Sequence, residues 1–250
     1  MKKALLIASL LLLANLLFAQ ESSSYPSDMG KRAIVKNWHR DPNITHGVII
    51  SSGLTLRQGE MYFADHELLL LQYSYGVHDR LQLGVSALFP ISTEFNVISP
   101  SLKFMVTPRN SPVHIALGGH YTQPLSSEGD IEGGLTGFVS GTIGNTCESF
   151  TFSAGYMAPV GVTDEDEGEP FVGFTGQTQV SRGVKLIGEV AGLPNVEDGY
   201  GALIGVRFIG SQITFDLMGV RPFAAEDGGI MFIPYVVFHY YFGNPKEGWR

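Results

Sequence analysis

Seven titratable side chains stand in segments where apolar and polar residues alternate, and these are the residues with which the chain could do chemistry. They are Lys103, His114, His120, Lys185, Glu189, Arg207 and Asp216. Lys185 and Glu189 are four residues apart, so on one strand they would share a face, with partners on neighbouring strands such as Arg207 and Asp216. In a barrel these residues predict either a salt-bridged interior or a pore lining that selects solutes by charge.

The same residues do not indicate an enzyme. His114 and His120 would lie about 20 Å apart on one strand, at roughly 3.3 Å per residue, so they cannot bind one metal ion. The sequence holds no Gly-x-Ser-x-Gly nucleophile turn and no His-Glu-x-x-His zinc motif. Ser86, either histidine and Asp216 could be recruited into a Ser/His/Asp set, but any barrel would supply similar residues. We therefore expect no enzymatic activity and no cofactor.

The densest charge feature is the acidic run within GVTDEDEGEPF. Its carboxylates belong to Asp164, Glu165, Asp166, Glu167 and Glu169. An EF-hand is excluded because Gly168 falls at position five and Thr175 at position twelve when counted from Asp164. An irregular Ca²⁺ or Mg²⁺ site of Asp164, Asp166 and Glu169 is the alternative. Other long connections are also acidic, which predicts a negative rim at one end of the fold. Its further members would be Glu94, Glu128, Asp130, Glu197, Asp198, Glu226 and Asp227.

The ends and the composition predict an exported protein. Residues 1–19 join a basic start, an apolar run and a final small residue, which is the layout of a cleaved signal peptide. We expect residues 20–44 to form a periplasmic N-terminal segment and residues 243–250 a C-terminal tail. The single cysteine, Cys147, excludes a disulfide scaffold and a paired-cysteine zinc site. A formal net charge of −8 argues against nucleic-acid binding.

Short β-strands with a period of two are predicted throughout residues 45–242. Residues 211–220, for example, place Ile213 and Phe215 on one face and Thr214 and Asp216 on the other. The segments are about 9–11 residues long, the length of a tilted strand that crosses a bilayer. The periodicity alone also fits a soluble barrel whose apolar faces point inward.

The connections favour the membrane barrel. Very short turns alternate with longer polar connections along the chain, as in outer-membrane barrels with short periplasmic turns and long extracellular loops. We expect an all-β, up-and-down antiparallel transmembrane barrel of about twelve strands, with ten as the alternative and both termini in the periplasm. The expected strands are 45–56, 60–75, 79–90, 96–107, 112–122, 132–143, 148–158, 169–180, 184–192, 199–209, 211–220 and 229–242. Strand 45–56 is the least defined of them.

One stretch, Ser52 to Ser86, resembles a recurring block in uncharacterised outer-membrane β-barrel proteins of Gram-negative bacteria. The similar positions are Leu56, Gly59, Glu60 and Tyr62, followed by Tyr75, Gly76, Val77, Asp79, Leu81, Leu83 and Gly84. The resemblance implies an outer-membrane location and a barrel architecture, and it implies no reaction. The last strand ends on Phe242 and is similar to the aromatic-ended strand that the outer-membrane assembly machinery recognises, although eight residues follow it here.

Two functions follow from these observations. The first is an outer-membrane barrel, either structural or a small passive channel, with a polar lumen and an acidic extracellular rim. Its partners would be outer-membrane lipid and the assembly machinery, with divalent cations as a further option at the acidic loops. The alternative is a soluble or surface-exposed barrel that binds a ligand.

Overall fold

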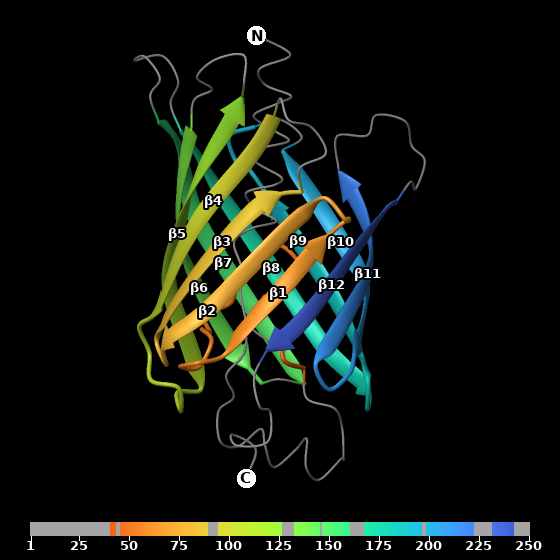
Figure 1. Ribbon diagram of the computed structural model, residues 1–250. Helices are drawn as coiled ribbons and strands as arrows, with labels where there is room; N and C mark the ends of the chain where they lie inside the picture. Colours follow the sequence, from red (N-terminus) through yellow and green to blue (C-terminus); the bar gives the residue numbers. More distant parts are fainter. Residues whose placement is uncertain are drawn as a thin grey trace.

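The protein is a closed barrel of twelve antiparallel strands (Figure 1). The computed structural model describes residues 41–43, 46–89, 95–126, 133–145, 147–160, 168–196, 199–222 and 232–242. Each strand pairs with its neighbours in sequence, and β1 pairs with β12 to close the wall. The expected all-β, up-and-down architecture is therefore confirmed. Within the described ranges no helix is long and apolar enough to cross a membrane.

The strands vary from 6 residues in β1 to 14 in β5, which makes the wall uneven in height. In chain order they are β1 Met61–His66, β2 Leu70–His78, β3 Leu81–Leu88, β4 Phe95–Met105, β5 Val113–Ser126, β6 Gly133–Gly144, β7 Glu148–Val160, β8 Glu169–Ser181, β9 Val184–Gly192, β10 Tyr200–Ile209, β11 Ile213–Pro222 and β12 Ile233–Phe242. The start of β1 and the end of β12 lie at the same end of the barrel as the short turns.

The number of strands agrees with the sequence prediction, but two of the expected strands were wrong. Residues 46–56 lie inside the barrel and contribute no strand to the wall. The expected strand 60–75 is instead the hairpin of β1 and β2. Its turn holds Glu67 and Leu68 at positive φ, 58° and 59°, and the Leu69 N–H donates to His66 O at 3.0 Å. Non-glycine residues rarely adopt this conformation, so the sequence carries no turn signal there.

Apolar side chains cover the outside of the wall, and polar ones point inward. On β3, Leu83 and Val85 are exposed, whereas Gln82 and Ser86 are buried. Aromatic rings also meet on the outer surface, for example Phe152 and Phe174 on β7 and β8, whose centroids lie 5.1 Å apart. A soluble ligand-binding barrel requires the opposite arrangement, since its core is its interior. The outer surface therefore has the character of a wall that faces lipid.

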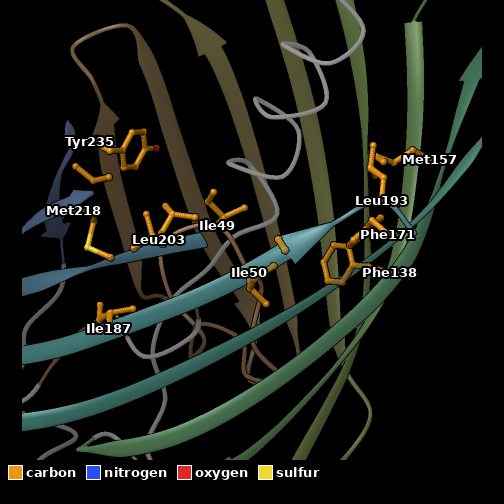
Figure 2. Close-up of a cluster of buried hydrophobic side chains, with 13 residues drawn as sticks. Ile49, Ile50, Phe138, Met157, Phe171, Ile187, Leu193, Leu203, Met218 and Tyr235 are labelled. Carbon is orange, nitrogen blue, oxygen red and sulfur yellow. The ribbon is translucent and has the colours of Figure 1, made fainter. Parts of the chain in front are cut away.

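The interior is not uniformly polar, which differs from the expected polar lumen. Ile187, Leu203 and Met218 point inward from β9, β10 and β11. They belong to a buried apolar cluster that reaches across the barrel to Phe138 and Phe171 (Figure 2). On these strands the cluster lies toward the long connections, and Lys185, Arg207 and Asp216 lie toward the short turns. Glu189 is the exception, because it lies at the level of the cluster, opposite Leu203. The lumen thus has a mainly apolar level and a charged level.

A charge on the outer wall tests this inside-out arrangement. Leu217 lies in the middle of β11 and is exposed on the outer face. We expect Leu217→Arg to reduce the free energy of folding into lipid vesicles by about 2–4 kcal/mol, because the guanidinium would enter hydrocarbon. Leu217→Ala is the control for lost side-chain area. Equal effects of the two substitutions in denaturant titrations would contradict a lipid-facing position.

Candidate functional site: a lumen filled by residues 41–56

The interior of the barrel is filled by the chain itself. Residues 46–56 are all buried, as are Asp41 and Asn43, and we call the described residues 41–43 and 46–56 the plug. The Gly47 N–H donates to Ile50 O at 3.1 Å, and His46 pairs with Ser51 in an isolated bridge, so the plug turns back on itself here. This turn pushes Val48, Ile49 and Ile50 into the apolar cluster of the wall (Figure 2).

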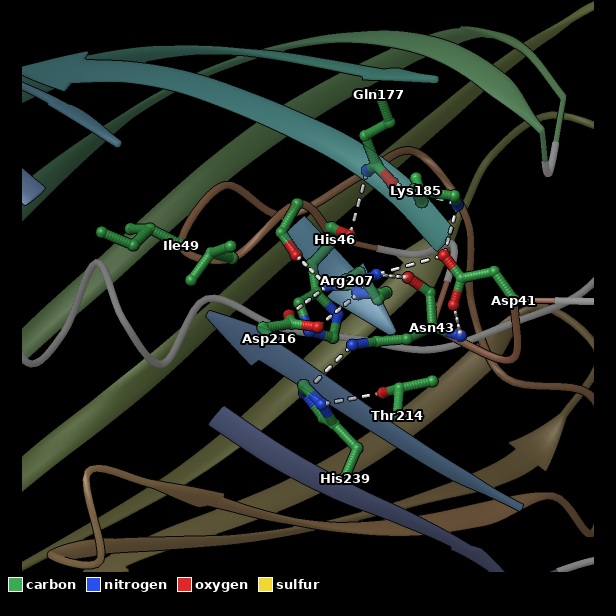
Figure 3. Close-up of polar contacts among 12 residues, drawn as sticks. Asp41, Asn43, His46, Ile49, Gln177, Lys185, Arg207, Thr214, Asp216 and His239 are labelled. Atoms are coloured by element: carbon green, nitrogen blue, oxygen red, sulfur yellow. Dashed lines mark hydrogen bonds and ion pairs between the residues drawn. The ribbon is translucent and has the colours of Figure 1, made fainter. Parts of the chain in front are cut away.

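Arg207 on β10 is the central contact between wall and plug (Figure 3). Its Nε and Nη2 donate to the two carboxylate oxygens of Asp216, at 2.8 and 2.6 Å. Its Nη1 donates to Asp41 Oδ2 at 3.2 Å and to Asn43 O at 2.6 Å, and Nη2 also donates to Gly47 O at 2.6 Å. A guanidinium has five N–H donors, and all five are used. Two of the bonds go to the wall and three go to the plug.

Three charged residues form a row across neighbouring strands at the level of Arg207. Arg207 is directly opposite Lys185 on β9 and opposite Asp216 on β11. Asp41 of the plug completes the row, because its Oδ2 accepts hydrogen bonds from both Lys185 and Arg207. All four side chains are essentially inaccessible to solvent. Buried charges must be paired to be tolerated, and here the pairing needs the plug.

A second contact lies further along β9, where Glu189 receives the turn of the plug. Three consecutive main-chain N–H groups point at its carboxylate, and the Thr175 hydroxyl donates to it at 3.0 Å. The donors are Val48 N at 2.5 Å, Ile49 N at 2.7 Å and Ile50 N at 3.3 Å. Such a concave set of N–H groups binds an anion well. Gly47 is required here, because a Cβ at this position would lie 1.4 Å from Glu189 Oε1.

Other wall side chains bind main-chain atoms along the rest of the plug. These bonds fix the course of the main chain of the plug and do not involve its side chains. They therefore depend little on the amino-acid sequence of the plug. They are Gln177 Nε2 to His46 O at 3.1 Å, Gly53 N to Thr142 Oγ1 at 2.8 Å and Leu56 N to Gln82 Oε1 at 3.0 Å.

Arg109, in the connection between β4 and β5, secures the end of the plug nearest β1. Its Nη2 donates to Leu56 O at 2.8 Å and to Thr55 O at 3.2 Å. Burial lowers the pKa of the Arg109 guanidinium to about 10, and the carboxylates of Asp79 and Glu60 oppose that shift. Arg109 is therefore protonated at neutral pH.

Histidines gather beside the plug in a cluster that the sequence did not reveal. The rings of His46 and His239 lie 5.4 Å apart, and those of His66 and His239 lie 6.1 Å apart. His66 Nδ1 is 2.9 Å from the Tyr235 hydroxyl, and His239 lies within hydrogen-bonding distance of Asn43 and Thr214. No group of three His, Cys, Asp or Glu residues in the described part of the chain is arranged to hold a metal ion.

The structure places all seven titratable residues singled out in the sequence at buried positions of the interior. Lys185, Glu189, Arg207 and Asp216 come together around the plug. His114 lies against it at Gly53, whereas His120 lies further along β5 and Lys103 on β4. Asp164 to Glu167 lie outside the described residues, and Glu169 begins β8. Plug residues such as Asp41 and His46 were missed, because the segment was interpreted as a lead-in and a strand.

Comparison with known proteins gives similarity of fold. No family model and no curated protein matches the sequence. Among solved structures, the KdgM porin in complex with disordered oligogalacturonate aligns with a TM-score of 0.53 at 9% identity, over 74% of this chain and 99% of that one. OprD of Pseudomonas aeruginosa aligns with a TM-score of 0.40 at 10% identity, over 74% of this chain and 66% of that one. KdgM is a porin, and at 9% identity the likeness concerns the fold alone.

Removal of the central guanidinium tests the charge row. We expect Arg207→Met to lower the free energy of unfolding by roughly 3–5 kcal/mol, because Asp216 would keep a buried charge without its partner. The double variant Arg207→Met/Asp216→Leu leaves Lys185 paired with Asp41 and should recover much of that loss. Denaturant titration in lipid vesicles measures both. If the double variant is no more stable than the single one, the unpaired Asp216 charge is not the cause.

A pair of glycines tests the fit of the plug. A Cβ on Gly53 would lie 1.9 Å from the main-chain oxygen of His114, whereas a Cβ on Gly141 in β6 meets nothing within 4 Å. We expect Gly53→Ala to displace the plug and to lower the unfolding temperature, and Gly141→Ala to leave it unchanged or slightly raised. Thermal unfolding followed by circular dichroism measures both. Equal unfolding temperatures would contradict the tight approach of plug and wall.

Proposed function

We propose that this protein is an outer-membrane β-barrel that acts as a small passive channel and is closed by its own plug. The observation that carries the proposal is that residues 46–56 fill the lumen without belonging to the wall. A channel of this design conducts only after the plug has moved. The location in the outer membrane is supported by the apolar outer surface and by the fold shared with porins.

The plug can leave the lumen without breaking the barrel. The wall is closed by the ladder of β1 and β12, which pairs Met61 to His66 with residues of the last strand. The plug precedes this ladder, and the described residues 46–56 contact the wall through side chains and main-chain hydrogen bonds. Water could replace these bonds, because Glu189, Thr142 and Gln82 are polar side chains of the wall. The apolar turn at Val48 to Ile50 opposes release.

Further parts of the proposal concern surfaces at the two ends of the barrel. We include an acidic outer rim formed by the long connections, which carries Asp164 to Glu167, as a place where divalent cations would bridge the protein to anionic lipid. Outer-membrane lipid and the assembly machinery are the proposed partners, and both termini are proposed to lie in the periplasm. The shared end of β1, β12 and the short turns supports that orientation.

A purely structural barrel is the second candidate. It is favoured by one observation, which is that three of the five donors of Arg207 are satisfied by the plug. A plug with such a role could be a permanent part of the barrel. The two candidates differ in whether the plug ever leaves.

Neutralisation of Asp41 separates the two candidates. We expect Asp41→Asn to raise channel activity in planar bilayers at least tenfold over the wild-type protein, since a loss of about 1.4 kcal/mol of closing energy already gives a factor of ten. A reporter cysteine follows the plug directly. In a Cys147→Ser background, Ser51→Cys is buried in the closed state and should react faster with a membrane-impermeant maleimide when Asp41→Asn is added.

Asp65→Asn is the matched control, because Asp65 lies on the outward-facing side of β1. It should change neither the current nor the labelling rate. If neither wild-type nor Asp41→Asn protein conducts, and the reporter stays unreactive in both, the channel is excluded and the structural barrel is retained.

A further inference from the structure

The charge row of the wall, formed by Lys185, Arg207 and Asp216, contains one carboxylate fewer than it has cations. Lys185 and Arg207 are directly opposite each other on β9 and β10, and like charges in this position repel. Asp216 is the wall's carboxylate in the row, and it binds the Nε and Nη2 face of Arg207. Glu189 does not balance the row, because it lies four residues along β9, about 13 Å away at 3.3 Å per residue. Two cations therefore face one anion.

Asp41 supplies the missing charge, and it belongs to the plug. One carboxylate oxygen accepts from both Lys185 and Arg207, and the other accepts from Asn43 N at 2.8 Å. Gln177 Oε1 lies 3.3 Å from Lys185 Nζ and helps to orient the ammonium group. The wall thus presents two buried cations to a carboxylate, and the plug carries the carboxylate that binds both (Figure 3).

We propose that Lys185 and Arg207 form a binding site for small carboxylate solutes in the open lumen, which Asp41 occupies while the plug is in place. This proposal rests on the proposed function, since solutes reach the site only after the plug moves. Departure of Asp41 leaves one uncompensated positive charge in the wall, and an incoming carboxylate restores the balance. The open channel should therefore favour anions, and carboxylates above all.

The surroundings limit the ligand to one negative charge. Asp216 already uses the bidentate face of Arg207, so Nη1, the second N–H of Nη2 and the Lys185 ammonium remain for the ligand. Glu189 on the same face of β9 loses the plug's N–H groups when the lumen opens and then repels a second carboxylate. Monocarboxylates should consequently be preferred over dicarboxylates that reach along the strand.

Chemical rescue tests the site in the full-length protein. Asp41→Ala removes the tethered carboxylate and should lower the unfolding temperature by roughly 5–10 °C. We expect sodium formate to restore at least half of that shift, and sodium chloride of equal ionic strength to restore much less. The double variant Asp41→Ala/Lys185→Met has one cation and one anion left in the row, so formate should not stabilise it.

Gly53→Ala is the matched control, because it displaces the plug by a steric contact with His114 and leaves every carboxylate of the lumen in place. Formate that stabilises Gly53→Ala as well as Asp41→Ala would reveal a general effect of the salt and overturn the proposal. Chloride that rescues as well as formate would also overturn it, because the site would then lack preference for carboxylates.

Reversal potentials of Asp41→Ala in a potassium chloride gradient, and then in a potassium formate gradient, separate the site from the channel. Anion preference that is greater in formate supports the proposal, and cation preference overturns it while the channel function stands. If formate rescues stability but no variant conducts, the proposed channel fails and the carboxylate site is retained.

Discussion

The structure depends on a buried guanidinium that needs five acceptors and finds only two in the wall. Arg207 binds Asp216 across the strand ladder, and its other three bonds go to Asp41, Asn43 and Gly47. Unsatisfied donors in a low-dielectric interior are costly, so a closed and dry lumen with Arg207 in it requires the plug. The charge of Lys185 imposes the same requirement, because its carboxylate partner is also Asp41. The buried charges of the wall are therefore neutralised only together with the plug.

Strand periodicity predicted the wall well because the two faces of each strand have different surroundings. It put Lys185 and Glu189 on one face of a strand and suggested Arg207 and Asp216 on the neighbouring ones, and the register brings Lys185, Arg207 and Asp216 into one row. The signal is strong because the sheet assigns successive side chains to lipid or lumen.

The plug could not be found in this way. Residues 46–56 include Val48, Ile49 and Ile50, and an apolar run of that kind in a barrel sequence suggests a strand. Their actual partners, such as Ile187 and Leu203, lie more than a hundred residues away and inside the barrel. The hairpin of β1 and β2 was missed for a different reason, since Glu67 and Leu68 make a turn without Gly or Asn. The sequence predicted one strand too many at residues 45–56 and one too few at residues 60–75. The total of twelve is therefore correct although these boundaries were wrong.

The inner surface of the wall is complementary to an occupant rather than to water. A water-filled pore is lined by polar residues, because apolar side chains that face water cost free energy. Here Phe138, Phe171 and Leu203 point inward and pack against the turn of the plug. Toward the short turns, the charge row lacks one anion, and Asp41 provides it. Both features of the wall, one apolar and one electrostatic, are complementary to the same short segment, so the plug completes the packing and the charge balance of the lumen.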